Sequence, residues 1–337
     1  MKKILIIHTG GTFGMVPIEP SKPLAPPAVQ DHILNYVPEI VKIANVDFET
    51  AFNIDSANIQ IRHWQKLTKI IRQSYNHYDG FVIIHGTDAM VYTACALSFM
   101  LQGLSKPVIL TGSQRPLAQI RSDARSNLIN SLELATAQIP EVCIFFGIHL
   151  YRGNRTIKIS STHYDAFISP NYPPLAEVGL DISISKKDLL NPGKNLVIHD
   201  QFDDRVFCFR FHPGLHPEYL KGLLDSPVKA VVIEALGSGN MAIFENSMIP
   251  WVEEMNKAGK IVVINSESPY GRINLDLYES GRRIKDAGAI PAGDMTTAAS
   301  IIKLMFLLGS YKNEIKTIKD RFGQPIAGEL TLYSTKS

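Results

Sequence analysis

The chain has 337 residues, of which 45% are hydrophobic, so it can bury a large core as one large domain or two ordinary ones. Its 34 Lys and Arg residues nearly balance 32 Asp and Glu residues, and the net charge of +2 predicts no nucleic-acid partner. Cys95, Cys143 and Cys208 are far apart, which favours core thiols in a reducing compartment over a disulfide framework or a thiolate metal site.

The N-terminus carries Lys2 and Lys3 before a short apolar run, but this run reaches glycine at once and is too short for a secretory signal. No segment approaches the roughly 18 consecutive apolar residues of a membrane span. We therefore expect a soluble, cytoplasmic protein with no membrane partner.

Apolar runs rich in Val and Ile predict buried strands in the first half of the chain, each before a glycine-containing turn and a segment of helical periodicity. These runs are Ile4–His8, Phe81–His85, Val108–Thr111 and Val142–Phe146. Because apolar residues follow one another without alternation, both faces of each strand are expected to be buried. The pattern predicts an α/β fold whose larger N-terminal part is a mostly parallel sheet with flanking helices.

The same pattern weakens after residue 185 and then resumes, which predicts a smaller C-terminal α/β domain. Its expected elements are strands at Val228–Glu234 and Lys260–Asn265 and a helix at Met295–Leu308. Leu196–His199 and Val206–Phe211 are read as edge strands or as a tethered crossover. The predicted division is a catalytic domain at 1–185, a connecting segment at 186–212 and a C-terminal domain at 213–337.

Small hydroxyl residues and glycines gather where three of the N-terminal strands end. The turns are Thr9–Thr12, His85–Asp88 and Thr111–Gln114. In open α/β sheets, ligands bind at the carboxyl ends of the strands, so these turns are expected to converge on one site. Thr12 follows Gly10 and Gly11, which suits a nucleophile approached closely by a ligand, although a turn threonine that bonds its own backbone is the commoner case.

The second turn offers a hydroxyl and a carboxylate, Thr87 and Asp88, which suit the orientation of a water and the binding of a substrate ammonium. A hydroxyl needs a neighbouring base at neutral pH, and Lys158 is a candidate, with a solvated surface lysine as the alternative. Asp55 and Ser56 offer polar groups for the two ends of a zwitterion, with helix capping as the stronger alternative.

Other catalytic motifs are absent from the sequence. It has no G-x-x-x-x-G-K-[ST] for phosphates, no G-x-S-x-G for a hydrolase serine and no H-E-x-x-H for zinc. His212 and His216 are four residues apart, but Pro213 and Gly214 lie between them and disfavour a helical metal pair. We therefore expect neither a metal nor a cofactor.

Several segments, in the right order, resemble the asparaginase family, and within it the bacterial cytoplasmic type I enzymes. The first signature is similar to Thr9–Met15 and the second to Phe81–Asp88, and together they are highly specific. Other similar segments are Val108–Gln114, Leu150–Thr156 and Gly293–Thr296, so the resemblance covers nearly the whole chain.

The resemblance implies a larger catalytic N-terminal domain, a smaller C-terminal one, and active sites near an intersubunit surface of a homodimer or homotetramer. It implies that Thr12 attacks the side-chain amide of L-asparagine, that a β-aspartyl ester forms with loss of ammonia, and that water then releases L-aspartate. The other implied site residues act beside Thr12, hold the substrate's charged groups or receive the oxyanion through the backbone: Gly11, Asp55, Ser56, Gly86, Thr87, Asp88 and Lys158.

One departure from the family concerns the loop after Thr12. The family places a tyrosine there to activate the nucleophile, whereas residues 15–30 contain none and the next tyrosine is Tyr36. Lys22 lies near the expected position, as a substitute base or, more commonly for such a loop, as a solvated lysine. The short stretch before Thr12 is also expected to exclude the extra N-terminal domain of the archaeal tRNA amidotransferase relatives.

Two other functions stay open at this stage. One is a relaxed asparaginase and glutaminase, because one additional methylene in a substrate changes selectivity by only about 1–3 kcal/mol. The other is an amino-acid-binding protein with little turnover, which the missing tyrosine favours and the presence of Thr12, Thr87, Asp88 and Lys158 disfavours.

Overall fold

The computed structural model describes residues 1–16, 19–23, 26–312 and 314–333, and the side chains of residues 15–28 are not described. It divides into two compact units, Met1–Asp200 and Gln201–Ser337. In the described part of the chain, no helix has both the length and the apolarity needed to cross a bilayer.

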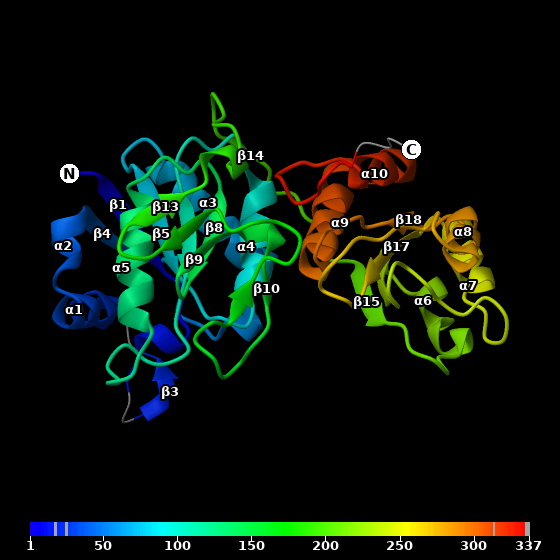
Figure 1. Ribbon diagram of the computed structural model, residues 1–337, viewed down its shortest axis with the longest axis horizontal. Helices are drawn as coiled ribbons and strands as arrows, with labels where there is room; N and C mark the ends of the chain where they lie inside the picture. The colour runs from blue at the N-terminus through cyan, green and yellow to red at the C-terminus, as the bar shows by residue number, and fades with distance from the viewer. Residues whose placement is uncertain (17–18, 24–25, 313, 334–337) are drawn as a thin grey trace. The chain divides into compact units, whose positions relative to one another are not determined.

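The first unit is built on an eight-stranded sheet, drawn from blue to green in Figure 1. In spatial order its strands are β13 (Ile182–Ile184), β12 (Ala176–Val178), β9 (His149–Arg152), β8 (Val142–Phe146), β7 (Val108–Thr111), β5 (Gly80–Ile84), β1 (Lys3–His8) and β4 (Asn45–Thr50). The strands from β8 to β4 run parallel, whereas β9, β12 and β13 pair antiparallel. Every residue of β5, β7 and β8 is buried, as expected for strands covered on both faces.

Helices cover both faces of this sheet (Figure 1). On one face lie α1 (Pro26–Tyr36), α2 (Ile40–Ile43) and α5 (Ala124–Ala135), and on the other α3 (Ile61–Ser74) and α4 (Met90–Met100). The buried side chains of α3 recur at helical spacing, Trp64, Leu67 and Ile71, so one face of the helix packs on the sheet. Nearly all of α4 is buried, which makes it a core helix rather than a surface one.

Short elements complete the first unit. Antiparallel pairs join β2 (Met15–Val16) to β3 (Glu19–Pro23), β10 (Ile157–Lys158) to β11 (Phe167–Ile168), and β6 (Leu101–Gln102) to β14 (Val197–Ile198). Single-turn 3₁₀ helices are η1 (Thr12–Gly14), η2 (Ser56–Asn58), η3 (Gly153–Arg155) and η4 (Lys186–Asp188).

The second unit has a four-stranded parallel sheet in the order β15 (Val206–Arg210), β16 (Ala230–Ala235), β17 (Ile261–Ser266) and β18 (Ile290–Pro291). Its helices are η5 (Pro217–Leu220), α6 (Gly222–Asp225), α7 (Ile249–Lys257), α8 (Glu279–Asp286), α9 (Thr297–Tyr311) and α10 (Ile315–Phe322). Trp251 and Met255 of α7 and Ile284 of α8 share one core with Val231 and Val262 of the sheet.

The structure confirms the predicted α/β class, with a larger mostly parallel sheet and a smaller α/β unit. The segment 186–212 does not form a separate body. Its strand β14 pairs with β6 of the first unit, whereas β15 is the edge strand of the second sheet. The division between units falls after Asp200, within the predicted connecting segment.

Candidate active site

The turn after β1 is shaped by two glycines that precede Thr12. Gly10 has φ of +106° and Gly11 has φ of +86°, in the region that favours glycine. A Cβ on Gly11 would lie 2.6 Å from Cα of Gly86, so the turns after β1 and β5 touch through their backbones. This contact places Thr12, at the start of η1, next to the turn that carries Thr87.

A chain of hydrogen bonds between buried side chains supports the turn after β5. The ring Nδ1 of His85 lies 2.7 Å from the Gly86 carbonyl, which can only accept, so Nδ1 carries the proton. Nε2 then accepts from the Thr93 hydroxyl at 3.0 Å, and Thr93 accepts from Trp64 at 3.1 Å. Burial lowers the pKa of His85 to about 4 against a smaller opposing effect of Gly86, so this support is uncharged at neutral pH.

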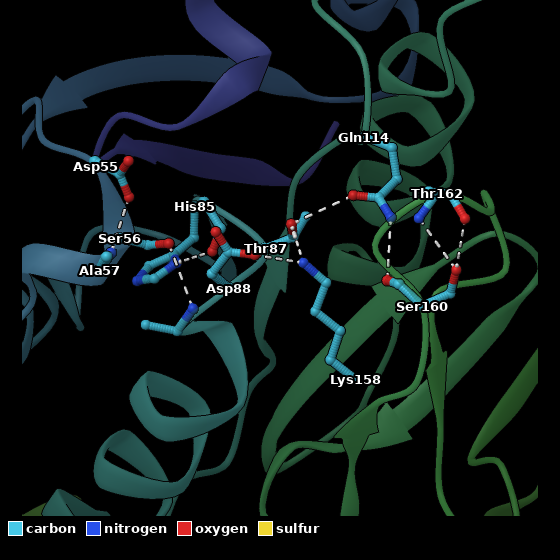
Figure 2. A network of polar contacts seen from close by, with 12 residues as sticks. Asp55, Ser56, Ala57, His85, Thr87, Asp88, Gln114, Lys158, Ser160 and Thr162 are labelled. Atoms are coloured by element: carbon cyan, nitrogen blue, oxygen red, sulfur yellow. Dashed lines mark hydrogen bonds and ion pairs between the residues drawn. The ribbon is translucent and has the colours of Figure 1, made fainter.

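Thr87, Asp88 and Lys158 form the polar centre of the site, shown in Figure 2. Lys158 Nζ donates to Thr87 Oγ1 at 2.9 Å and to Asp88 Oδ1 at 2.6 Å. The Lys158 side chain is 16% exposed and that of Asp88 is 70% exposed, so the amine is held inside while the carboxylate faces solvent. The arrangement can move a proton between Lys158 and Thr87 and can bind a cation at Asp88.

Lys158 is positioned by the β10–β11 pair and by the buried ion pair between Arg152 and Glu141. Arg152 Nε donates to Glu141 Oε2 at 2.6 Å, and both side chains are almost fully buried. The same guanidinium lies 4.3 Å from the ring centre of Tyr172 and donates to the Asp188 carbonyl at 2.8 Å. These contacts fix the end of β9, from which the chain turns toward Lys158.

Asp55 and Ser56 lie on the opposite side of Thr87 from Gln114 (Figure 2). Asp55 is exposed and accepts from the Ala57 backbone at 2.9 Å as the cap of η2, the alternative favoured for it from sequence. Ser56 is buried, its hydroxyl accepts from the Ala89 backbone at 3.3 Å, and it packs directly against Gly86. Both residues are thus brought to the site, Ser56 more closely than Asp55.

Gln114 is a site residue to which the sequence patterns assigned no role, although its segment was singled out. Its Oε1 accepts from Thr87 Oγ1 at 3.4 Å, and its Nε2 donates to the carbonyls of Ser160 and His163 at 3.3 and 3.1 Å. Its backbone N–H donates to the Asp123 carboxylate at 3.0 Å. Desolvation raises the pKa of Asp123, and the backbone N–H groups of Gln114 and Arg115, which donate to its carboxylate, partly oppose this rise. The third turn therefore reaches Thr87, as the sequence predicted for the three strand ends.

The loop after Thr12 contributes the β2–β3 hairpin. The side chain of Lys22, considered as a substitute base, lies outside the described residues. Tyr36 is at the end of α1 with its side chain exposed and its ring against His32. Among the described residues, no three or more His, Cys, Asp or Glu side chains gather as metal ligands would.

Comparisons with known proteins identify the relatives of the chain. Residues 3–190 match the family described as Asparaginase, N-terminal, and residues 205–322 match the Glutaminase/Asparaginase C-terminal domain. L-asparaginase 1 of Escherichia coli is 38% identical over 338 residues, which cover 98% of each chain. The thermostable L-asparaginase of Thermococcus kodakarensis superposes with a TM-score of 0.90 at 34% identity, over 98% of this chain and 100% of that one.

The relatives also include proteins that are not named as asparaginases. A glutamyl-tRNA(Gln) amidotransferase component of Pyrococcus abyssi is 34% identical over 99% of this chain and 78% of its own. Both family matches and the full-length similarity to an L-asparaginase agree with the resemblance in the motifs. The chain therefore belongs to the asparaginase family.

Proposed function

We propose that this protein hydrolyses the side-chain amide of L-asparagine to L-aspartate and ammonia, with Thr12 as the nucleophile and without a cofactor. The observation that carries the proposal is the Lys158–Thr87 contact of 2.9 Å in a turn that touches the turn of Thr12. Full-length similarity to proteins named L-asparaginase supports the choice of substrate.

In the first half-reaction, Thr12 Oγ1 bonds to the amide carbon, the C–N bond breaks and the Thr12 proton leaves with the nitrogen as ammonia. Backbone N–H groups near Gly11, Gly86 and Thr87 receive the developing oxyanion. The exposed carboxylate of Asp88, with Asp55 and Ser56, holds the α-ammonium and α-carboxylate of the substrate.

In the second half-reaction, a water held by Thr87 attacks the β-aspartyl ester. Lys158 enters this step as the uncharged amine, because only that form has a lone pair for a proton. One water proton passes to Thr87 Oγ1 as the Thr87 proton passes to Lys158 Nζ, which is the base. The bond from the ester carbon to Thr12 breaks, Lys158 returns a proton to Thr12 Oγ1, and aspartate leaves. The direct Lys158–Thr87 hydrogen bond supports this short path.

The test is ammonia release from L-asparagine by the wild type and by Thr87→Ala. We expect turnover by the wild type and a loss of about 10²–10⁴-fold in the variant, the usual worth of an acid–base group. Equal ammonia release by the two proteins would overturn the assignment of Thr87.

A relaxed asparaginase and glutaminase is the first alternative, consistent with the name of the C-terminal family. The ratio of kcat/KM for L-asparagine to that for L-glutamine separates the two functions. An amino-acid-binding protein is the second alternative, and calorimetric binding of asparagine or aspartate without ammonia release would favour it.

Two further properties are proposed on the resemblance. The protein is expected to form a homodimer or homotetramer, which light scattering of the purified chain tests. It is expected in the cytoplasm, in keeping with three free cysteines at Cys95, Cys143 and Cys208.

A further inference from the structure

Gln114 determines where the hydroxyl proton of Thr87 points. The amide of Gln114 has one possible orientation, because the carbonyls of Ser160 and His163 only accept and must face its Nε2. Its Oε1 therefore faces Thr87 at 3.4 Å and can only accept, so Thr87 is the donor in that bond. With its single proton directed to Gln114, Thr87 Oγ1 must accept from Lys158 at 2.9 Å.

A threonine oxygen has two lone pairs and one proton. In this arrangement Lys158 occupies one lone pair and Gln114 takes the proton, so one lone pair remains (Figure 2). A water that enters the site must then approach Thr87 as a donor. In this orientation the water oxygen is free to attack the ester, and one water proton already faces Thr87 Oγ1, which will receive it.

We propose that Gln114 is a positioning residue for the water step, holding the Thr87 proton until that proton moves to Lys158. The inference rests on the proposed function. The contact of 3.4 Å to Gln114 is long for a hydrogen bond, so Gln114 holds the Thr87 proton weakly. Lys158 receives that proton as the uncharged amine, after its Nζ lone pair turns to Thr87 Oγ1 in place of the N–H that donates at 2.9 Å. The step that forms the ester uses no water and does not require this transfer.

Gln114 is well placed for this role because both ends of the residue are anchored. Its backbone N–H is bound to Asp123, and Asp123 also accepts from Asn127, which donates to the Gly112 carbonyl. Its side-chain amide is tied to the loop that follows Lys158 by two backbone carbonyls. The acceptor is therefore held still while the lysine and the threonine exchange a proton.

The test compares the two half-reactions in wild type and Gln114→Met, a residue of similar length without an acceptor. Exchange of ¹⁸O from labelled water into the side-chain carboxylate of added L-aspartate measures the water step in both directions, without ammonia. In contrast, kcat/KM for ammonia release from L-asparagine reports the step that forms the ester. We expect ¹⁸O exchange to fall about three- to tenfold, the worth of one neutral hydrogen bond, with kcat/KM within about a factor of two. If Gln114→Met does not fold, Gln114→Leu makes the same comparison.

Gln102→Met is the control for the loss of a glutamine amide as such. Its side-chain amide donates to the Phe99 carbonyl elsewhere in the unit. This variant is expected to keep exchange within about a factor of two of the wild type.

The outcomes are distinct. Unchanged exchange in Gln114→Met, an equal fall in exchange and kcat/KM, or the same fall in Gln102→Met overturns the role of Gln114. A wild type that neither releases ammonia nor exchanges ¹⁸O instead overturns the proposed function, because that result does not depend on Gln114.

Discussion

Replacement of Gly11 by alanine should disrupt the contact that brings Thr12 and Thr87 together. Alanine at φ of +86° costs about 1–2 kcal/mol from backbone strain alone. The new Cβ would also lie 2.6 Å from Cα and 2.7 Å from N of Gly86, and backbone atoms cannot move aside as a flexible side chain can. Overpacking of this kind costs about 1–3 kcal/mol more, so we expect a total loss of about 2–5 kcal/mol in the free energy of unfolding.

Gly147→Ala is the matched control in the same unit. Gly147 has φ of +65°, but a Cβ there would meet its nearest atom at 3.9 Å, an ordinary contact. This variant carries the backbone strain without the clash, so it should lose about 1–2 kcal/mol and keep its activity.

Urea unfolding and ammonia release measure the two effects. Each unit contains one tryptophan, Trp64 in the first and Trp251 in the second, so fluorescence of Trp64 in a Trp251→Phe background follows the first unit. Because a displacement of about 1 Å at a reacting group can cost about 10²-fold, kcat/KM of Gly11→Ala should fall by that order. Activity and stability of Gly11→Ala equal to those of Gly147→Ala would refute the reasoning.

Three other predictions concern charge. Burial lowers the pKa of His8 and His85 from 6.5 to about 4, so between these values the unfolded chain binds more protons than the folded one and stability falls as pH falls. Urea unfolding at pH 5 should show a loss of roughly 2 kcal/mol per histidine relative to pH 7.5, and constant stability would contradict this. Glu141→Ala leaves the Arg152 guanidinium buried without its carboxylate and should lower the free energy of unfolding in urea by about 3–5 kcal/mol. A loss below about 1 kcal/mol would show that the ion pair contributes little to stability. Lys158→Met should lower kcat by about 10²–10⁴-fold in the ammonia assay, and retention of wild-type kcat would exclude it as the base.

The sequence predicts the parts of the site that depend on local pattern. The continuous Val and Ile runs of β1, β5 and β7 identify strands buried on both faces, and parallel strands necessarily bring their carboxyl ends to one edge. The three turns with Thr12, Thr87 and Gln114 follow directly from that rule.

Other parts depend on contacts that no local pattern contains. The antiparallel return begins with β9, which has only four residues, and continues through β12 and β13, which have three residues each and are partly exposed. Strands this short show no clear periodicity in the sequence. Lys158 is placed by β10 and by the pairing of Glu141 with Arg152, and Gln114 meets Thr87 from 27 residues away in the chain. The tautomer of His85 follows only from the carbonyl of Gly86 that faces it.

The central claim is that the Thr12 hydroxyl is the nucleophile, and ammonia release from L-asparagine by Thr12→Ala and Thr12→Ser tests it most directly. Thr9→Ala is the control, since the Thr9 hydroxyl is committed to the Ile84 carbonyl at 2.9 Å and the Thr9 backbone N–H also donates to that carbonyl. We predict that Thr12→Ala loses turnover while Thr12→Ser and Thr9→Ala retain it. Turnover by well-folded Thr12→Ala at the rate of the wild type would contradict the claim.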